Sequence, residues 1–147
     1  MIYIGVDPDV DKSGFAAWDS RLKQFSEISD YRIFSLLARI DDYLADGHDV
    51  TVVIEAGFLN NKSNFHGTVN QSKSVGEKIA LSVGANHQVG RIIAEYCQIK
   101  KIKFLEQKPL PKKWGKKRDS KINAEEFKKI SDWNGKTNPE KRDAAMM

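Results

Sequence analysis

Five short segments along the chain predict the strands of a sheet. Four of them are apolar runs, at residues 2–6, 14–18, 50–54 and 102–105. The fifth covers residues 23–28, where Phe25 and Ile28 lie among polar residues. A turn at residues 19–21 lies between segments 14–18 and 23–28, so these two segments predict a β-hairpin.

Apolar residues at helical spacing predict four helices between and after these strands. The first helix is expected from Ile33 to Gly47, with Ser29 or Asp30 as its N-terminal cap. The others are expected over residues 73–99, over residues 124–130 and from Asn138-Pro139 onward, where proline suits the first helical turn.

The long helix and the segment before it are unusual. Residues 57–74 form an 18-residue polar stretch, and loops of more than about 12–15 residues are usually functional or disordered. The helix that follows contains Gly76, Gly84 and Gly90. Because each interior glycine costs about 1 kcal/mol relative to alanine, these positions predict either a break or the close approach of another backbone.

This order of elements predicts an α/β layer sandwich around a mixed five-stranded sheet, built as a single domain over residues 1–147. The apolar runs are too short to cross a bilayer, and the first residues lack the features of a signal peptide, so a cytoplasmic protein is expected. Cys97 is the only cysteine, which excludes an intrachain disulfide and a cysteine-based zinc site.

Charge is divided unevenly along the chain. Residues 1–99 hold nine Lys and Arg against 13 Asp and Glu, whereas residues 100–147 hold 15 against seven. An acidic part joined to a basic part suggests that one part grips a polyanion while carboxylates act in the other. A solvated lysine-rich tail explains the charge count equally simply, so particular residues must decide.

Four acidic residues are the candidates for chemistry. Asp7 and Glu55 each end an apolar strand, and ligands of α/β sheets gather at the carboxyl ends of parallel strands. Glu140 and Asp143 lie one turn apart on the last helix. Such a cluster needs cations, and oxygen-only ligands select Mg²⁺ or Mn²⁺, which can promote phosphodiester cleavage. Each residue alone has an ordinary structural explanation, and only the set points to a metal-dependent nuclease.

Three segments carry a resemblance to a known family. They are Ile4-Gly5-Val6-Asp7-Pro8 with Ser13-Gly14-Phe15-Ala16, then Val52-Val53-Ile54-Glu55, then Asn138-Pro139-Glu140-Lys141-Arg142-Asp143-Ala144-Ala145. In this order and spacing the chain resembles the RuvC-like Holliday junction resolvases of the ribonuclease H-like superfamily. The resemblance runs through nearly the whole chain.

The resemblance implies a ribonuclease H-like three-layer sandwich and a Mg²⁺-dependent endonuclease, with Mn²⁺ as a substitute, that cuts branched DNA in recombination and repair. Asp7, Glu55, Glu140 and Asp143 match the family's acidic positions, as catalytic and metal-binding residues. A homodimer is expected through the long helix. Asp9 departs from the family, which commonly has glycine there, and the last helix is expected to be cut short at Met147.

Candidate DNA-binding residues lie in two segments. The stretch 57–74 supplies Phe58, Lys62 and Lys73, and a base stacked on an aromatic ring such as that of Phe58 gains about 1–3 kcal/mol. Residues 108–121 carry a net charge of +6 around Trp114 and resemble a phosphate clamp. A disordered basic loop explains this charge equally well. The candidates in this second segment are Lys112, Lys113, Lys116, Lys117 and Arg118.

Two other functions are open at this point. One is a non-catalytic, structure-selective DNA-binding module with the same fold and an incomplete site. The other is a phosphotransferase of the actin-like group, whose first strand also ends in an acidic residue before a hairpin. That group needs a second nucleotide-binding half, for which 147 residues are too few.

Overall fold

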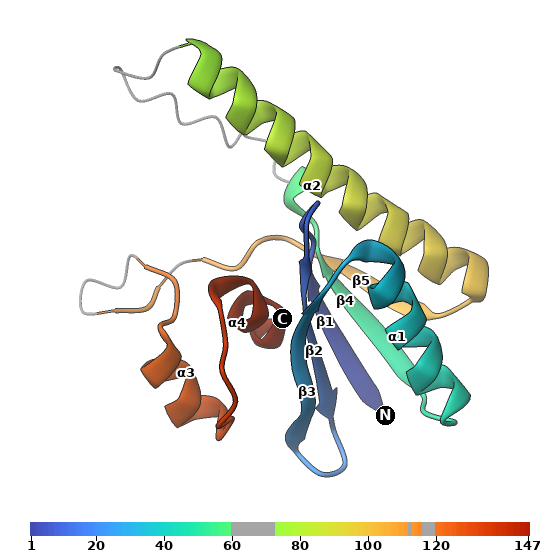
Figure 1. Cartoon of the computed structure of the whole chain (residues 1–147). Helices are drawn as coiled ribbons and strands as arrows, with labels where there is room; N and C mark the ends of the chain where they lie inside the picture. The colour runs from blue at the N-terminus through green and yellow to red at the C-terminus, as the bar shows by residue number, and fades with distance from the viewer. Residues whose placement is uncertain (60–72, 112, 116–119) are drawn as a thin grey trace.

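The computed structural model describes residues 1–59, 73–111, 113–115 and 120–147, with Lys73 described by its backbone alone (Figure 1). Within these ranges the elements follow the predicted order. They are β1 (Ile2–Asp7), β2 (Ser13–Asp19), β3 (Gln24–Tyr31), α1 (Ile33–Ala45), β4 (Val50–Glu55), the 3₁₀ turn η1 (Gly57–Leu59), α2 (Lys73–Lys100), β5 (Lys103–Gln107), α3 (Ala124–Ser131) and α4 (Pro139–Met146).

The strands form one mixed sheet in the order β3-β2-β1-β4-β5. β1, β2 and β3 are antiparallel neighbours, whereas β4 and β5 run parallel to β1. Asp7 pairs with Gly14, and Gly14 pairs with Asp30, so these three positions form one row across the sheet. The predicted α/β fold with a mixed five-stranded sheet is confirmed.

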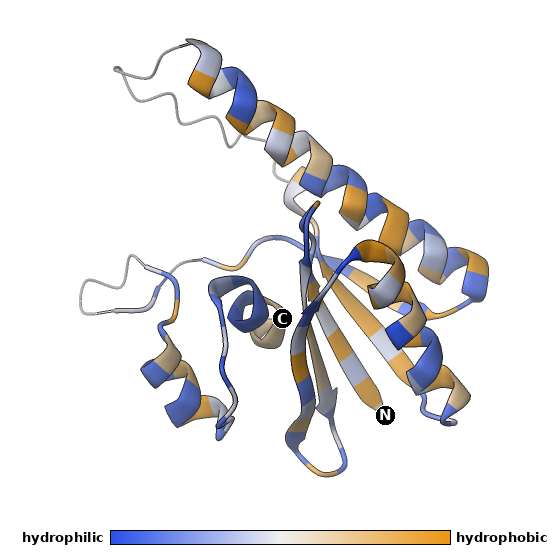
Figure 2. Ribbon diagram, in the orientation of Figure 1, coloured by the Kyte–Doolittle hydropathy of each residue, from blue (hydrophilic) through white to orange (hydrophobic). Residues whose placement is uncertain are grey.

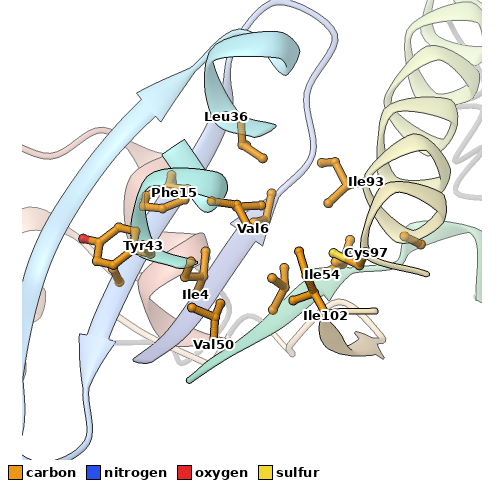
Figure 3. Close-up of a cluster of buried hydrophobic side chains, with 14 of the residues drawn as sticks. Ile4, Val6, Phe15, Leu36, Tyr43, Val50, Ile54, Ile93, Cys97 and Ile102 are labelled. Carbon is orange, nitrogen blue, oxygen red and sulfur yellow. The ribbon is translucent and has the colours of Figure 1, made fainter. Parts of the chain in front are cut away.

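One face of the sheet is covered by α1 and α2 (Figure 1). The larger hydrophobic core lies beneath them, where Val6 of β1 and Phe15 of β2 meet Leu36 of α1 and Ile93 of α2, all fully buried (Figure 3). Cys97 of α2 is also buried in this core, as expected of a helical core residue.

The opposite face carries α3 and α4, which completes three layers (Figure 1). A smaller cluster lies on this side and joins both helices to the sheet. It contains Ala16, Ile28, Ile122, Phe127 and Ala144. Since side chains alternate along a strand, Ala16 and Phe15 of β2 supply opposite faces of the same sheet.

The predicted cap of the first helix is wrong. α1 begins at Ile33 with Arg32 as its N-cap residue and without a side-chain cap. Ser29 and Asp30 lie instead in β3, which continues to Tyr31. Pairing with β2 carries the strand through these polar residues, and the hydrogen bonds of that pairing override the local capping preference.

The long helix is continuous from Lys73 to Lys100, so its glycines cause no break. A Cβ atom built on Gly90 would lie 3.4 Å from Cγ of Pro8 and 3.5 Å from Cε1 of Phe58. The glycine therefore lies where α2 passes close to the loop after β1. A Cβ atom built on Gly84 meets nothing within 4 Å.

The first part of α2 extends beyond the sheet (Figure 1). Apolar residues dominate β1 and β4, whereas β3 and α2 are mixed along their length and α3 is largely hydrophilic (Figure 2). Within the described ranges, no helix combines the length and the apolar character that a bilayer crossing requires.

Candidate metal and nuclease site

Asp7 and Glu55 end neighbouring parallel strands at the same edge of the sheet. Val6 of β1 pairs with Ile54 of β4, so the residues that follow them lie side by side in sequence register. Val6 and Ile54 point into the core beneath α1 and α2. Alternation along the strands therefore turns Asp7 and Glu55 toward the other face, where α4 packs.

Helix α4 lies directly on the backbone of β1 and β2 because two glycines leave space for it. A Cβ atom on Gly5 would lie 2.0 Å from the carbonyl oxygen of Ala144. A Cβ atom on Gly14 would lie 2.1 Å from the carbonyl oxygen of Glu140. No side chain can occupy either position while the helix stays in place, so both glycines are required by close packing.

This close packing brings the acidic residues of α4 within electrostatic range of Asp7. Burial is the largest cause that raises the pKa of Asp7, and repulsion from Glu55, Asp143 and Glu140 raises it further. Lys121 opposes this effect, and the resulting pKa of Asp7 is about 7. The structure therefore groups the other three predicted carboxylates around half-buried Asp7, and the role of all four as ligands stays a prediction.

Lys121 lies in this group although the sequence pattern did not single it out as a site residue. Its ammonium forms a hydrogen-bonded ion pair with the Asp143 carboxylate. Burial opposes the charge of Lys121, but the hydrogen bond to Asp143 and the negative charges of Asp143, Asp7 and Glu140 together outweigh burial, and the pKa of Lys121 is raised. In the sequence Lys121 is one of several lysines in a basic segment, and no spacing distinguishes it from the others.

Arg142 fixes the chain segment that carries Lys121. Its guanidinium is buried and donates from Nε to the carbonyl oxygen of Ile122 at 2.9 Å. Its Nη1 donates to the carbonyl oxygen and to Oγ1 of Thr137, at 3.2 and 3.1 Å. One side chain of α4 thereby holds the segments on both sides of α3. The sequence carries no local signal for these contacts.

The donor set suits a hard divalent cation by its chemistry. Four carboxylates offer only oxygen ligands, which favour Mg²⁺ or Mn²⁺ over softer metals. In the part of the chain that the structure describes, no three His, Cys, Asp or Glu side chains are gathered closely enough to hold an ion as they stand. A bound cation would have to draw the carboxylates together and compete with Lys121 for Asp143.

Phe58 lies on the 3₁₀ turn after β4, three residues after Glu55, and its ring packs against α2. The guanidinium carbon of Arg91 lies 4.9 Å from its ring centroid, and the ring of His87 lies edge-on with a centroid separation of 6.1 Å. Both partners belong to α2. The ring is half-buried, so it is fixed by α2 and still partly open to a ligand.

Asp9, the departure from the family pattern, ties the loop after β1 to α2. Its Oδ2 accepts from Nδ2 of Asn86 at 3.1 Å, while Oδ1 of Asn86 accepts from the amide of Val10 at 2.9 Å. The other carboxylate oxygen of Asp9, Oδ1, accepts from the backbone amide of Asp11 at 2.8 Å. These contacts give Asp9 a structural use in place of glycine.

The predicted DNA-binding lysines are only partly covered by the structure. Lys113 is exposed, next to the isolated bridge between Trp114 and Ser120. Lys73 begins α2, and its side chain is not described. Lys62, Lys112, Lys116, Lys117 and Arg118 lie outside the described residues.

The sheet order, the three layers and the acidic strand ends together define a ribonuclease H-like α/β fold. Solved structures of RuvC from Thermus thermophilus share this fold. RuvC in complex with a Holliday junction substrate aligns with a TM-score of 0.54 and 12% identity over 98% of this chain and 87% of that chain. A second RuvC structure gives 0.52 and 14% over 98% and 89%.

Comparison by sequence adds nothing further: neither family models nor curated proteins match the chain. The predicted resemblance to the RuvC resolvases is therefore confirmed through the fold. At 12–14% identity this likeness establishes the architecture alone.

Proposed function

We propose that the protein is a metal-dependent endonuclease that hydrolyses phosphodiesters in Holliday junctions or other branched DNA. The observation that carries the proposal is the grouping of Glu55, Asp143 and Glu140 around Asp7, which together with burial raises the pKa of Asp7 to about 7. A partly buried acidic cluster of this kind is costly to keep ionised without a cation. Its place at the carboxyl ends of β1 and β4 is where α/β folds hold ligands.

In this proposal Asp7, Glu55 and Asp143 would hold the cation, with Glu140 assisting. When bound, Mg²⁺ would supply positive charge that stabilises negative charge developing on a phosphate. Asp7 must be deprotonated to act as a ligand, so metal binding and cleavage should weaken as the pH falls below the pKa of Asp7.

Branched DNA is the proposed substrate for two reasons. The RuvC structure that shares this fold is a complex with a Holliday junction. The chain also carries a half-buried aromatic ring, Phe58, three residues after Glu55, and such a ring can stack on an unpaired base. The basic segment 108–121 would add contacts to the phosphate backbone, which carry no sequence preference.

A direct test compares cleavage of a labelled four-way junction with cleavage of a linear duplex of the same sequence, in Mg²⁺, in Mn²⁺ and in EDTA. We expect cleavage of the junction that requires the metal. Tight junction binding without cleavage in either metal would instead support a non-catalytic DNA-binding module. Equal rates of cleavage of the junction and of the linear duplex would contradict the proposal that branched DNA is the substrate.

We also propose a homodimer formed through α2. Val75, Ile79 and Leu81, in the N-terminal part of α2, are 44%, 40% and 74% exposed. The first part of this helix extends beyond the sheet (Figure 1). Val75 and Ile79 lie one turn apart, on one face of the helix. Exposed apolar side chains at this spacing are typical of a helix that packs against a partner.

Ile79→Asp should therefore shift the protein from dimer to monomer, measured by sedimentation velocity, because it places a charge in the proposed interface. Phe34→Asp on α1 is the matched control, since Phe34 is 83% exposed and lies outside α2. If both variants sediment like the wild type, α2 is not the interface.

Lys121→Met should raise the pKa of Asp7 above about 7, because Lys121 is the group that lowers it. The carboxyl carbon of Asp7, followed by NMR in metal-free protein, reports this pKa. Lys103→Met is a suitable control, since Lys103 forms an ion pair with Asp49 at 3.7 Å. Asp49 directly precedes β4, at the opposite end of the strand from Glu55. An unchanged titration of Asp7 in Lys121→Met would show that Lys121 does not act on the site.

The remaining parts of the proposal are a single nuclease domain over residues 1–147 and a cytoplasmic location. Both rest on the sequence pattern described above.

A further inference from the structure

We infer that Asp30, near the end of β3, is a positioning residue that anchors the N-terminus of α4 and thereby sets Glu140 and Asp143 at the candidate site. The inference rests on the proposed metal-dependent function. Asp30 lies on the same face of the sheet as Asp7, but its contacts are with Asn138, Lys141 and Lys12.

Asp30 collects three contacts, two of which come from α4 and its cap. Its Oδ2 accepts from Nδ2 of Asn138 at 3.0 Å and lies 3.3 Å from the ammonium of Lys141. Its Oδ1 lies 3.9 Å from the ammonium of Lys12, in the loop between β1 and β2. The Asp30 side chain is only 22% exposed, so its carboxylate is partly shielded from solvent. Ion pairs are stronger there than at the open surface.

Asn138 transmits this anchor to the helix. Its Oδ1 accepts from the backbone amide of Lys141 at 2.8 Å and so caps α4, while its Nδ2 donates to Asp30. Both ends of one side-chain amide are therefore used, and this fixes the orientation of the cap. An N-cap that is itself held by the sheet fixes the place where the helix begins as well as its stability.

The sheet register explains why this anchor matters for the site. Asp7, Gly14 and Asp30 form one row across β1, β2 and β3. The carbonyl of Glu140 lies over Gly14 in the middle of this row. The helix is thus held at the Asp30 end of the row, and it delivers Asp143 toward Asp7 at the other end. Loss of the anchor would let the helix start shift and carry both acidic residues with it.

A shared pocket connects the anchor with Glu140. An open pocket of about 380 Å³ between the β1–β2 loop and α4 is lined by Asp30, Asn138 and Glu140, together with Asp9, Asp11, Lys12 and Arg32. The Asp30 carboxylate forms ion pairs with Lys12 and Lys141, which gives it a structural role. Glu140 lines the same pocket, and its negative charge raises the pKa of Asp7.

The test measures Mn²⁺ binding to the whole protein, through the EPR signal of the free ion, and hydrogen exchange of the α4 amides in metal-free protein. We expect Asp30→Ala to weaken Mn²⁺ binding about tenfold and to speed exchange of the Lys141 and Arg142 amides. Asp30→Asn keeps an acceptor for Asn138 and should lose less of both. Asp49→Ala is the matched control, because Asp49 also pairs with a lysine but lies away from α4.

A double-mutant cycle tests whether Asp30 acts through the cap. If it does, Asp30→Ala combined with Asn138→Ala should bind Mn²⁺ no more weakly than Asn138→Ala alone. Wild-type affinity in Asp30→Ala would overturn the inference, whether or not exchange is faster, and additive losses would overturn transmission through Asn138. A wild-type protein that binds no Mn²⁺ would instead overturn the proposed function, which separates the two failures.

Discussion

Asp7→Asn is expected to abolish metal-dependent cleavage and, at the same time, to stabilise the metal-free protein at neutral and alkaline pH. Loss of cleavage follows because the amide removes a charged ligand from the centre of the acidic group. Even residues that only support metal ligands are worth about 10–100-fold in affinity or activity, so a loss of at least about 100-fold is expected for a ligand itself.

The gain in stability follows from the sign of the pKa shift. The pKa of Asp7 is raised from 3.8 to about 7 in the folded protein, so the folded state holds this proton more tightly than the unfolded state does. The free energy of unfolding of the metal-free wild type should therefore fall as the pH rises from about 4 to about 7, and then level off. At about pH 8 the lost stability is roughly 4 kcal/mol at most, at about 1.4 kcal/mol per pKa unit.

Asn at this position does not ionise, so that pH dependence should be much weaker in the variant. The buried amide has its own desolvation cost, which reduces the net gain in stability to a few kcal/mol or less. Urea unfolding in EDTA at several pH values measures the free energy of unfolding, and junction cleavage in Mg²⁺ measures activity. Added Mg²⁺ should stabilise the wild type and leave the variant unchanged.

Asp19→Asn is a control with the opposite sign. The backbone amides of Leu22 and Arg21 donate to Oδ1 of Asp19, at 3.2 and 2.8 Å, and they lower the pKa of this carboxyl. Replacement of Asp19 should therefore reduce stability at neutral pH and leave metal binding intact. If Asp7→Asn also destabilises the metal-free protein at alkaline pH, or retains cleavage, the assignment of Asp7 as the central ligand is wrong.

The elements that position Asp7 and Glu55 could be predicted because their signals are local. Each lies at the end of a run of buried strand residues, and the hydrophobic pattern of such a run marks where the strand stops. The final helix was equally clear, since Asn138 and Pro139 are a typical helix start and the structure uses both in that way.

The contacts that hold these elements together could not be predicted in the same way. Asn138 and Asp30 are 108 residues apart, and Asn86 and Asp9 are 77 apart. Such pairs depend on strand register and helix packing, which a single sequence does not encode locally. Asp30 shows the difficulty: its local sequence suggested a helix cap, whereas the sheet places it in β3, where it holds the cap residue of a different helix.

Lys121 was hidden for a related reason. A basic run predicts solvated lysines, and only the fold shows that one of them is turned toward Asp143 by the contact between Arg142 and the backbone of Ile122. The carboxylates of the candidate site can thus be found from local sequence patterns. The ammonium of Lys121 and the contacts made by Asp30 and Arg142 become visible only in the tertiary structure.

Gly5→Ala should have a large effect on stability and on the site although it changes no charged residue. The new Cβ atom would lie 2.0 Å from the carbonyl oxygen of Ala144, far inside van der Waals contact, and the obstacle is backbone that cannot rotate away. Helix α4 must therefore move off the sheet. Overpacking of this kind costs about 1–3 kcal/mol, and loss of the buried contacts of Ala144 and Arg142 would add to it.

The displacement should reach the site because the same helix carries Asp143. With α4 farther from β1, Asp143 and Glu140 would act less on Asp7, and burial of Asp7 would decrease, so the pKa of Asp7 should fall toward 3.8. Mn²⁺ binding should weaken with it, although no ionisable group has been changed. Thermal unfolding, NMR titration of Asp7 and Mn²⁺ binding measure these effects on one variant.

Gly84→Ala provides the matched control for this substitution. Gly84 lies inside α2, and a Cβ atom built there meets nothing within 4 Å, so the same chemical change should stabilise the helix by up to about 1 kcal/mol and leave the site untouched. Opposite signs for the two substitutions would show that the cost at Gly5 comes from α4 and not from alanine. If Gly5→Ala preserved both the pKa of Asp7 and Mn²⁺ affinity, close packing of α4 on β1 could not be what assembles the acidic group.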